Sequence, residues 1–350
     1  MNSIFASRAL ILVSLAAAVS SGCTAGIPAT TTPTFVSTSV PAAADTVFVA
    51  SDAWAPVPGG VFELFSVGGA SQATRLTFCL GCQALSAAPS LDRTRIALRR
   101  VVADTNGDDR LNDLDQVSLL LVDLARQVEG SFLPGGWSNS SVDWASDGSF
   151  LIHTSSPTGG PDDLYQIDAN AQNNQPLLST PTVRERGARL DPAITKVVYE
   201  RIEGVGAGKS EIWVFPSNPT QGRLTVGGVT GEALAGTLYL VGSDAGPDYS
   251  PDGANVVFRR LTSNAVAGGA WDILTVPASG GVPRLIVSGP QFRSNPDWSK
   301  EGVVFAESNL ATGGTDIVVI DPLSGARRVL QSFGRGFTSG APRWIAGIAG

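Results

Sequence analysis

The chain has 350 residues, of which 43% are hydrophobic and 16% are charged, with 40 glycines and 22 prolines. This composition is typical of a turn-rich globular protein, long enough for one large all-β domain or two ordinary domains. The 24 basic and 31 acidic residues give a net charge of -7, which argues against a nucleic-acid-binding surface.

The N-terminal residues 1–23 predict a targeting segment that is removed from the mature protein. Arg8 precedes the apolar run Ala9–Val19, which is too short to span a bilayer. The small residues before Cys23 resemble the lipobox of bacterial lipoproteins, in which the cysteine is lipidated and becomes the new N-terminus. Ordinary cleavage and secretion is the alternative. Residues 24–44 are rich in Thr, Pro and Ala and predict an extended, flexible tether.

The remaining cysteines, Cys79 and Cys82, form a single C-x-x-C pair. In an oxidising compartment this spacing favours a local disulfide that staples a loop, with a redox-active pair as the alternative. Gln83 follows where haem attachment would require a histidine, and the chain holds a single histidine and no second C-x-x-C for zinc.

One sequence pattern recurs along the chain. The stretch "YSPDGANVVF", Tyr249 to Phe258, joins a tight turn to an apolar strand. Related stretches are spaced 46 to 59 residues apart, and they begin at Pro89, Trp144, Leu190, Tyr249, Trp298 and, cut short, Trp344. This spacing identifies an internal repeat.

Each complete copy is followed by two further short apolar runs, such as "DILTV" and "PRLI", so that a unit holds four strands, which is typical of a propeller blade. Ahead of the first copy, "DTVFVAS", "GVFELFSV" and "TRLT" supply strands two to four of a further unit, and the C-terminal "PRW" supplies its first strand. The sequence therefore predicts an all-β, six-bladed β-propeller over residues 45–350, closed by N-terminal strands that pair with the C-terminal strand.

The turn pattern P-x-[WY]-S-x-[DE]-G at Pro247–Phe258 and Pro296–Phe305 resembles the WD40-like repeats of TolB-like β-propellers of the bacterial envelope. Arg93 and Ile194 replace the turn glycine in two copies. The resemblance implies a propeller that binds protein partners. With Thr24 after the lipidated cysteine, it also implies attachment to the outer membrane, facing the periplasm, if the source is Gram-negative.

The two faces of the predicted disc differ in loop length. Turns between strands one and two are short, whereas Gly227–Gly246 and Arg260–Trp271 are long and lie on the opposite, long-loop face. Loops on a rigid scaffold commonly carry binding sites. Arginine and aromatic residues near the starts of the first strands are the candidate partner contacts: Trp137, Arg184, Arg186, Phe292, Arg293, Arg335 and Phe337. The alternative is that they pack on neighbouring loops and pair with acidic side chains.

The loop "DTNGDDRLNDLD" has the spacing of a calcium-binding loop. Its candidate ligands are Asp104, Asn106, Asp108, the carbonyl oxygen of Arg110, and Asp115. A Ca²⁺ ion here would stabilise the loop structurally. The alternative is a solvated acidic hairpin loop, because Asp109 stands where such loops usually have glycine.

No recognisable catalytic set emerges. His153, the single histidine, falls at an apolar strand position, which favours a packed core residue over a catalytic one. A carboxylate pair such as Asp162 and Asp244 could serve a glycosidase, but its spacing does not select it over other acids. We therefore expect a monomeric, envelope-anchored lipoprotein that is a binding or scaffold module and not an enzyme, contacting an envelope protein through its long-loop face. The alternatives are a hydrolase or lyase that acts on carbohydrate or peptide in the channel, and a degenerate paralogue without a surviving partner.

Overall fold

The computed structural model of the chain describes residues 46–51, 63–68, 73–76, 82–92, 94–101, 103–105, 107, 115–123, 128–133, 141–156, 160–170, 172–204, 208–216, 222–226, 228, 232–234, 239–266, 268–334 and 342–345. Every helix or strand assigned within these ranges is a β-strand. The described residues accordingly include no helix that is long and apolar enough to cross a membrane.

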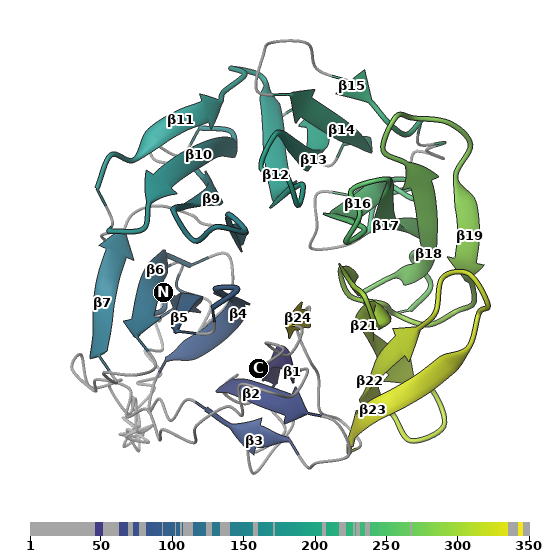
Figure 1. Ribbon diagram of the computed structural model, residues 1–350. Coiled ribbons are helices and arrows are strands. Elements are labelled where there is room, and N and C mark those ends of the chain that lie inside the picture. The colour runs from purple at the N-terminus through teal and green to yellow at the C-terminus, as the bar shows by residue number, and fades with distance from the viewer. Residues whose placement is uncertain are drawn as a thin grey trace, which may run out of the picture.

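The described strands form six four-stranded sheets arranged around a central axis (Figure 1). Within each sheet the strands are antiparallel neighbours. The first three sheets along the chain, each given from the axis outward, are β24 (Arg343–Ile345), β1 (Thr46–Ser51), β2 (Glu63–Gly68) and β3 (Thr74–Arg75); β4 (Gln83–Pro89), β5 (Arg95–Val101), β6 (Val117–Asp123) and β7 (Val128–Leu133); and β8 (Val142–Trp144), β9 (Phe150–Ser155), β10 (Asp163–Asp168) and β11 (Gln175–Leu178).

The other three sheets are β12 (Val183–Leu190), β13 (Lys196–Glu203), β14 (Ser210–Pro216) and β15 (Gly222–Arg223); β16 (Asp244–Tyr249), β17 (Asn255–Ser263), β18 (Ala270–Pro277) and β19 (Arg284–Val287); and β20 (Asp297–Ser299), β21 (Gly302–Asn309), β22 (Gly314–Ile320) and β23 (Arg327–Phe333). The axial strands contact one another around the ring in the order β4, β8, β12, β16, β20, β24 and back to β4.

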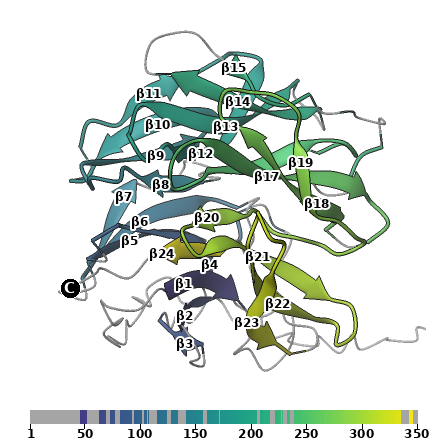
Figure 2. The same cartoon turned by 45° about the vertical axis from the view of Figure 1, so that its right-hand side comes forward.

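One sheet contains strands from both ends of the chain. β24 pairs antiparallel with β1, with Trp344 opposite Val47 (Figures 1 and 2). β2 and β3 complete this sheet on its outer side. The all-β propeller of four-stranded blades is thus confirmed, and the N-terminal strands pair with the C-terminal strand as the repeat predicts.

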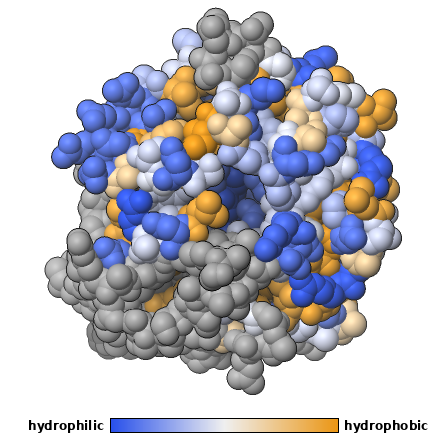
Figure 3. All heavy atoms as spheres, in the orientation of Figure 1, coloured by the Kyte–Doolittle hydropathy of each residue, from blue (hydrophilic) through white to orange (hydrophobic). Residues whose placement is uncertain are grey.

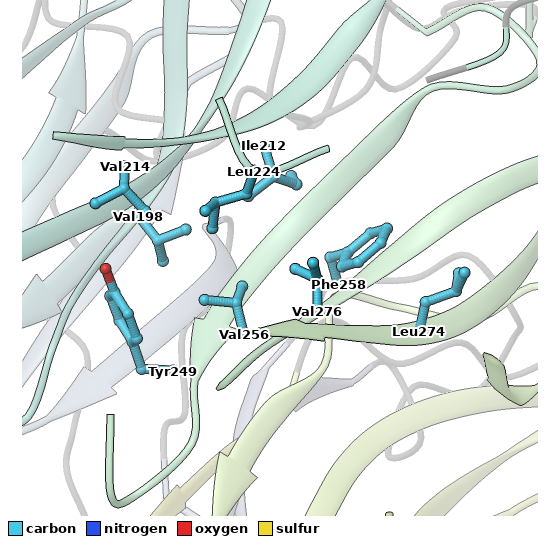
Figure 4. Close-up of a cluster of buried hydrophobic side chains, with 9 residues drawn as sticks. All are labelled: Val198, Ile212, Val214, Leu224, Tyr249, Val256, Phe258, Leu274 and Val276. Carbon is cyan, nitrogen blue, oxygen red and sulfur yellow. The ribbon is translucent and has the colours of Figure 1, made fainter. Parts of the chain in front are cut away.

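The hydrophobic core lies between the blades. Middle strands are covered on both faces by the adjacent blades, so all seven residues of β22 are buried, whereas the outer strand β19 is exposed or half-buried. One cluster joins two neighbouring blades (Figure 4) and comprises Val198, Ile212, Val214 and Leu224 from one and Tyr249, Val256, Phe258, Leu274 and Val276 from the next. This arrangement explains why the middle strands read as continuous apolar runs and not as alternating ones.

The turns between axial and second strands share one geometry. In the repeat at Tyr249, the Ser250 hydroxyl donates to Asp252 at 2.5 Å, and Gly253 adopts a φ of 71°. In the repeat at Leu190, Ile194 occupies the equivalent position with a φ of 57°, and its N–H donates to the Asp191 carbonyl as the Gly253 N–H does to Ser250. A β-branched residue therefore sits where the turn requires a left-handed backbone.

The long-loop face contains a small core of its own. Leu234 and Val241, from the segment before β16, pack with Ala245, Leu261 and Trp271. The predicted loop Arg260–Trp271 is shorter than expected, because β17 extends to Ser263 and β18 begins at Ala270. This packing holds Leu234 and Val241 against strands β16, β17 and β18 of the same blade.

Exchange of residues between the two equivalent turns tests the strain at Ile194. We expect Ile194→Gly to raise the free energy of unfolding by about 1 kcal/mol, because strained positive-φ positions cost roughly that amount. The matched change Gly253→Ile places a β-branched residue in the same turn of the next blade. It should lower the free energy of unfolding by about 1 kcal/mol or more. Urea unfolding of both variants measures this. Destabilisation by Ile194→Gly would contradict the strain.

Candidate functional site

The channel is lined by charged residues from one repeat position. The residue directly before the anchor of the repeat is charged in five axial strands: Asp143 on β8, Arg189 on β12, Asp248 on β16, Asp297 on β20 and Arg343 on β24. Asp143, Arg189 and Asp297 are buried, with Asp297 5% and Arg189 9% exposed, and Asp248 and Arg343 are half-buried. In the sixth sheet, β4 carries Ala88 at this position.

Each of the three aspartates accepts a hydrogen bond from the main chain of the next blade. The N–H of Leu190 donates to Asp143 at 3.0 Å, that of Trp298 to Asp248 at 2.6 Å, and that of Trp344 to Asp297 at 2.7 Å. An ionised acceptor strengthens such bonds. The aspartates therefore link successive blades at the channel wall.

The two arginines partly neutralise the aspartates. Arg343 pairs with Asp143 at 2.5 Å and with Asp297 at 3.0 Å. Burial acts to lower the pKa of Arg343, but Asp297 and Asp143 outweigh it and raise that pKa. Arg189 approaches Asp248 to 4.0 Å, too far for a hydrogen bond. Burial, together with the charge of Asp297, raises the pKa of Asp248.

A cavity lies at each mouth of the channel, and Figure 3 shows hydrophilic residues around the central hollow. The cavity on the turn face, of about 380 Å³, is lined by Asp143, Asp248 and Asp297 among others. The other cavity, of about 230 Å³, lies nearer the starts of the axial strands, at Ser141, Gly187 and Gly246, and so on the long-loop face. Arg343 lines both.

The second cavity is lined by four arginines and by no carboxylate among the described residues. These arginines are Arg99, Arg189, Arg259 and Arg343. Arg259 lies over the ring of Trp271, 3.9 Å from its centroid, and its Nη1 donates to the Arg293 carbonyl at 2.8 Å. The long-loop face of this acidic protein thus has a cationic opening to the channel.

The predicted partner contacts on this face have different environments. Arg184 donates to the Gly204 carbonyl at 3.4 Å, and Arg186 forms an ion pair with Asp162 at 3.1 Å. Phe292 is half-buried and packs on the cluster around Trp271. Trp137, Arg335 and Phe337 lie outside the described residues.

Arg293 differs from the expected surface contact, because its side chain is buried and only 1% exposed. Its Nε donates to Glu307 at 2.7 Å, and its Nη1 donates to the Trp271 carbonyl at 2.7 Å. Glu307 also pairs with Arg327 at 2.5 Å. Arg293 is therefore a structural residue that ties the approach to β20 to β18 and β21, in agreement with the packing alternative for this residue.

Only part of the candidate calcium loop is described. Asp104 accepts a hydrogen bond from the Gly107 N–H, and Asp115 accepts one from the Thr105 N–H, both at 2.7 Å. Asn106, Asp108 and Arg110 lie outside the described residues. Within the described residues, no three His, Cys, Asp or Glu side chains form a group able to hold a metal ion. Calcium binding stays a prediction.

Cys82 is buried and disulfide-bonded. Cys23 and Cys79 lie outside the described residues, so lipidation at Cys23 and the pairing partner of Cys82 stay predictions.

His153 is 0% exposed, and its Nε2 lies 2.9 Å from Asn174 Oδ1. Burial lowers the pKa of His153 to about 4, which keeps the ring neutral. The two acids considered for a glycosidase are separately engaged, since Asp162 pairs with Arg186 and Asp244 with Arg260 at 2.6 Å.

The sequence carried a signal for the channel residues that motif searching missed. The repeat alignment places "VDW", "ARL", "PDY", "PDW" and "PRW" in register, so that a charge stands before the anchor in five copies. A charged residue that recurs at one fixed position of the axial strands indicates a channel-lining role. Arg99 and Arg259 likewise share a register, one residue after Leu98 and Phe258.

The fold and the channel define the protein as a β-propeller with a charge-lined axis. No protein-family model matches the sequence, and no curated protein matches it. Solved structures do match. The chain is similar to TolB from Acinetobacter baumannii, with 16% identity and a TM-score of 0.64 over 87% of this chain and 67% of that one.

Two further structures show the same fold in other settings. A chain in the crystal structure of a nidogen–laminin complex is 10% identical, with a TM-score of 0.60 over 87% of this chain and 100% of that one. An oligogalacturonate lyase in complex with manganese is 12% identical, with a TM-score of 0.50 over 79% of this chain and 71% of that one. At these identities the similarity establishes the fold.

Removal of the bridging arginine tests the channel ion pairs. We expect Arg343→Met to lower the free energy of unfolding by about 3 kcal/mol, because Asp143 and Asp297 would remain buried without their cation. The control Arg328→Met removes an exposed arginine 4.0 Å from Glu301 and should cost under about 1 kcal/mol. Guanidinium unfolding compares the two. Equal effects of both changes would contradict a stabilising role for the pairs.

The calcium hypothesis predicts a metal-dependent stability. Calcium should raise the melting temperature of the purified protein above its value in EDTA, because a bound ion stabilises the native state alone. Asp104→Ala should abolish this shift. Asp92→Ala, which removes an acid from another exposed turn, should keep it. The hypothesis fails if calcium has no effect or if Asp104→Ala leaves the shift intact.

Proposed function

We propose that the protein is an envelope-anchored binding or scaffold module that captures a protein partner through its long-loop face. In this proposal Cys23 carries the lipid, residues 24–44 tether the propeller to the membrane, and the propeller works as a monomer in the envelope. The fold is shared with TolB from Acinetobacter baumannii and with a chain of the nidogen–laminin complex, and the second of these structures is a complex of proteins.

The observation that carries the proposal is the close packing of the described part of the long-loop face. Leu234 and Val241 pack on Trp271, and the buried Arg293–Glu307 pair holds the adjacent loop. Segments that are packed in this way lose little conformational freedom when a partner binds, which favours affinity. Phe292 and the arginine-lined cavity lie on the same face, and together they offer an aromatic group beside positive charge.

A second candidate is a hydrolase or lyase that acts on carbohydrate or peptide at the channel. The observations that favour it are the fold shared with an oligogalacturonate lyase and the presence of a cavity at each channel mouth. The channel acids whose contacts are described hold neighbouring main-chain N–H groups and arginines, as a structural role requires. This weighs toward binding as the primary function.

Affinity capture from a native envelope extract tests the proposal, with the purified protein as bait. We expect one envelope protein to be retained by the wild type and lost with the double variant Arg335→Glu, Phe337→Ala. The control Lys300→Glu changes an exposed residue at the turn-face cavity and should retain the partner. Retention by all three baits would place the contact elsewhere. Retention by none would count against a scaffold and favour screening glycans and peptides for turnover.

A further inference from the structure

The arginine-lined cavity on the long-loop face has an unusual charge for this protein. The whole chain has a net charge of -7, yet the cavity is lined by Arg99, Arg189, Arg259 and Arg343 without a described carboxylate. The three channel aspartates line the opposite cavity. Four guanidinium groups thus line one mouth of the channel, in surroundings of low dielectric constant that strengthen their attraction for an anion.

Several polar atoms around this cavity lack hydrogen-bond partners in the described part of the chain. They are Nε of Arg189, Nε of Arg259, Nη1 of Arg343 and Oδ1 of Asn295, and all four atoms are buried. Buried N–H donors without acceptors are costly, and they are uncommon in folded proteins. Three of the four arginines that line the cavity thus each carry one buried donor that the described protein atoms leave unmatched.

The guanidinium groups are held in place by contacts with neighbouring protein groups. Arg343 is fixed by Asp143 and Asp297, and Arg259 is fixed by the Trp271 ring and the Arg293 carbonyl. Arg99 donates through Nη1 to Ser86 at 3.2 Å. Groups fixed before binding lose little freedom when a ligand arrives.

Nearby carboxylates do not replace the missing acceptor. Asp248 lies 4.0 Å from Arg189 Nε, and Glu200 is occupied by the Tyr239 hydroxyl and the Gly246 N–H, at 2.7 Å and 2.6 Å. Burial lowers the pKa of both Arg189 and Arg259, although three aspartates act to raise the first and Tyr239 and Glu200 act to raise the second. An incoming anion would offset this cost of burial.

We propose that this cavity binds a carboxylate group. A planar carboxylate matches the paired N–H donors of guanidinium, and a volume of about 230 Å³ accommodates a small di-acid or the terminal residue of a peptide. The inference rests on the proposed function, because it names the chemistry by which the long-loop face would recognise its ligand. The carboxylate comes either from a free organic acid or from the C-terminus of a partner chain.

The test measures binding of defined probes to the purified full chain by calorimetry and by thermal shift. The probes are succinate, its neutral diamide, a tripeptide with a free C-terminus, and the same tripeptide amidated. We expect at least one of the two carboxylate probes to bind and its neutral analogue not to bind. A preference for succinate identifies a small-acid site, and a preference for the free tripeptide identifies recognition of a chain terminus.

Two variants connect the binding to this cavity. Arg259→Gln removes one cation and should weaken carboxylate binding at least tenfold. Asn295→Asp is nearly isosteric, so the fold should survive. It places a carboxylate at the cavity lining, which should weaken binding at least tenfold while raising the melting temperature of the unliganded protein. The control Arg284→Gln removes an exposed arginine that bonds the Pro322 carbonyl outside the cavity and should leave binding unchanged.

The proposal is overturned if neither carboxylate probe binds the wild type, or if Asn295→Asp and Arg259→Gln both bind as the wild type does. These outcomes are independent of partner capture. Capture that depends on the long-loop face without carboxylate binding would remove this inference and leave the scaffold function. Carboxylate binding without partner capture would support this inference and count against the scaffold function.

Discussion

The structure depends on how the axial strands satisfy their inner edges. Each axial strand pairs with a second strand on one side only, so the main-chain N–H groups on its other edge need acceptors from elsewhere. Asp143, Asp248 and Asp297 supply them across the boundary between blades. These carboxylates are buried and therefore need cations, which explains the presence of Arg189 and Arg343 in the same ring.

This solution makes the channel electrically asymmetric. The side chains that hold the blades together place carboxylates at the turn face, whereas arginines of the axial and second strands open toward the long-loop face. The arginines follow the repeat as the aspartates do, since Arg189 and Arg343 occupy the same repeat position as the aspartates, and Arg99 and Arg259 share another. The same side chains that stabilise the ring thereby make the electrostatic potential differ between the two ends of the channel, as is typical of charged clefts with low-dielectric walls.

The sequence was sufficient for the architecture because its determinants are local. A turn with glycine or aspartate at set positions, followed by an apolar run, specifies a hairpin wherever it occurs, and even Ile194 adopts the backbone that the repeat demands. The pairing of β1 with β24 also followed from counting strands. Local chemistry and repeat length together left few alternatives.

The site was less predictable because its determinants are distant along the chain. Arg293 reads as a surface contact until Glu307 and the Trp271 carbonyl are brought beside it by the fold. Arg343 meets Asp143 only after the ring has closed, across 200 positions of sequence. Charge at a repeat position could have been noticed in the alignment, but the sign and partner of each charge depend on which blades become neighbours.

The sheet shared by the two ends of the chain has a consequence for synthesis. Strands β1, β2 and β3 are made long before their axial partner β24 at residues 343–345, so this blade cannot be completed before residue 345 has been made. Until then β1 has an open edge, and Asp297 lacks the hydrogen bond that the Trp344 N–H donates to it in the closed ring. Contacts this distant in sequence form late and slowly. Closure of the ring therefore waits for synthesis of β24, and a chain cut short before residue 343 would form an open arc and not a ring.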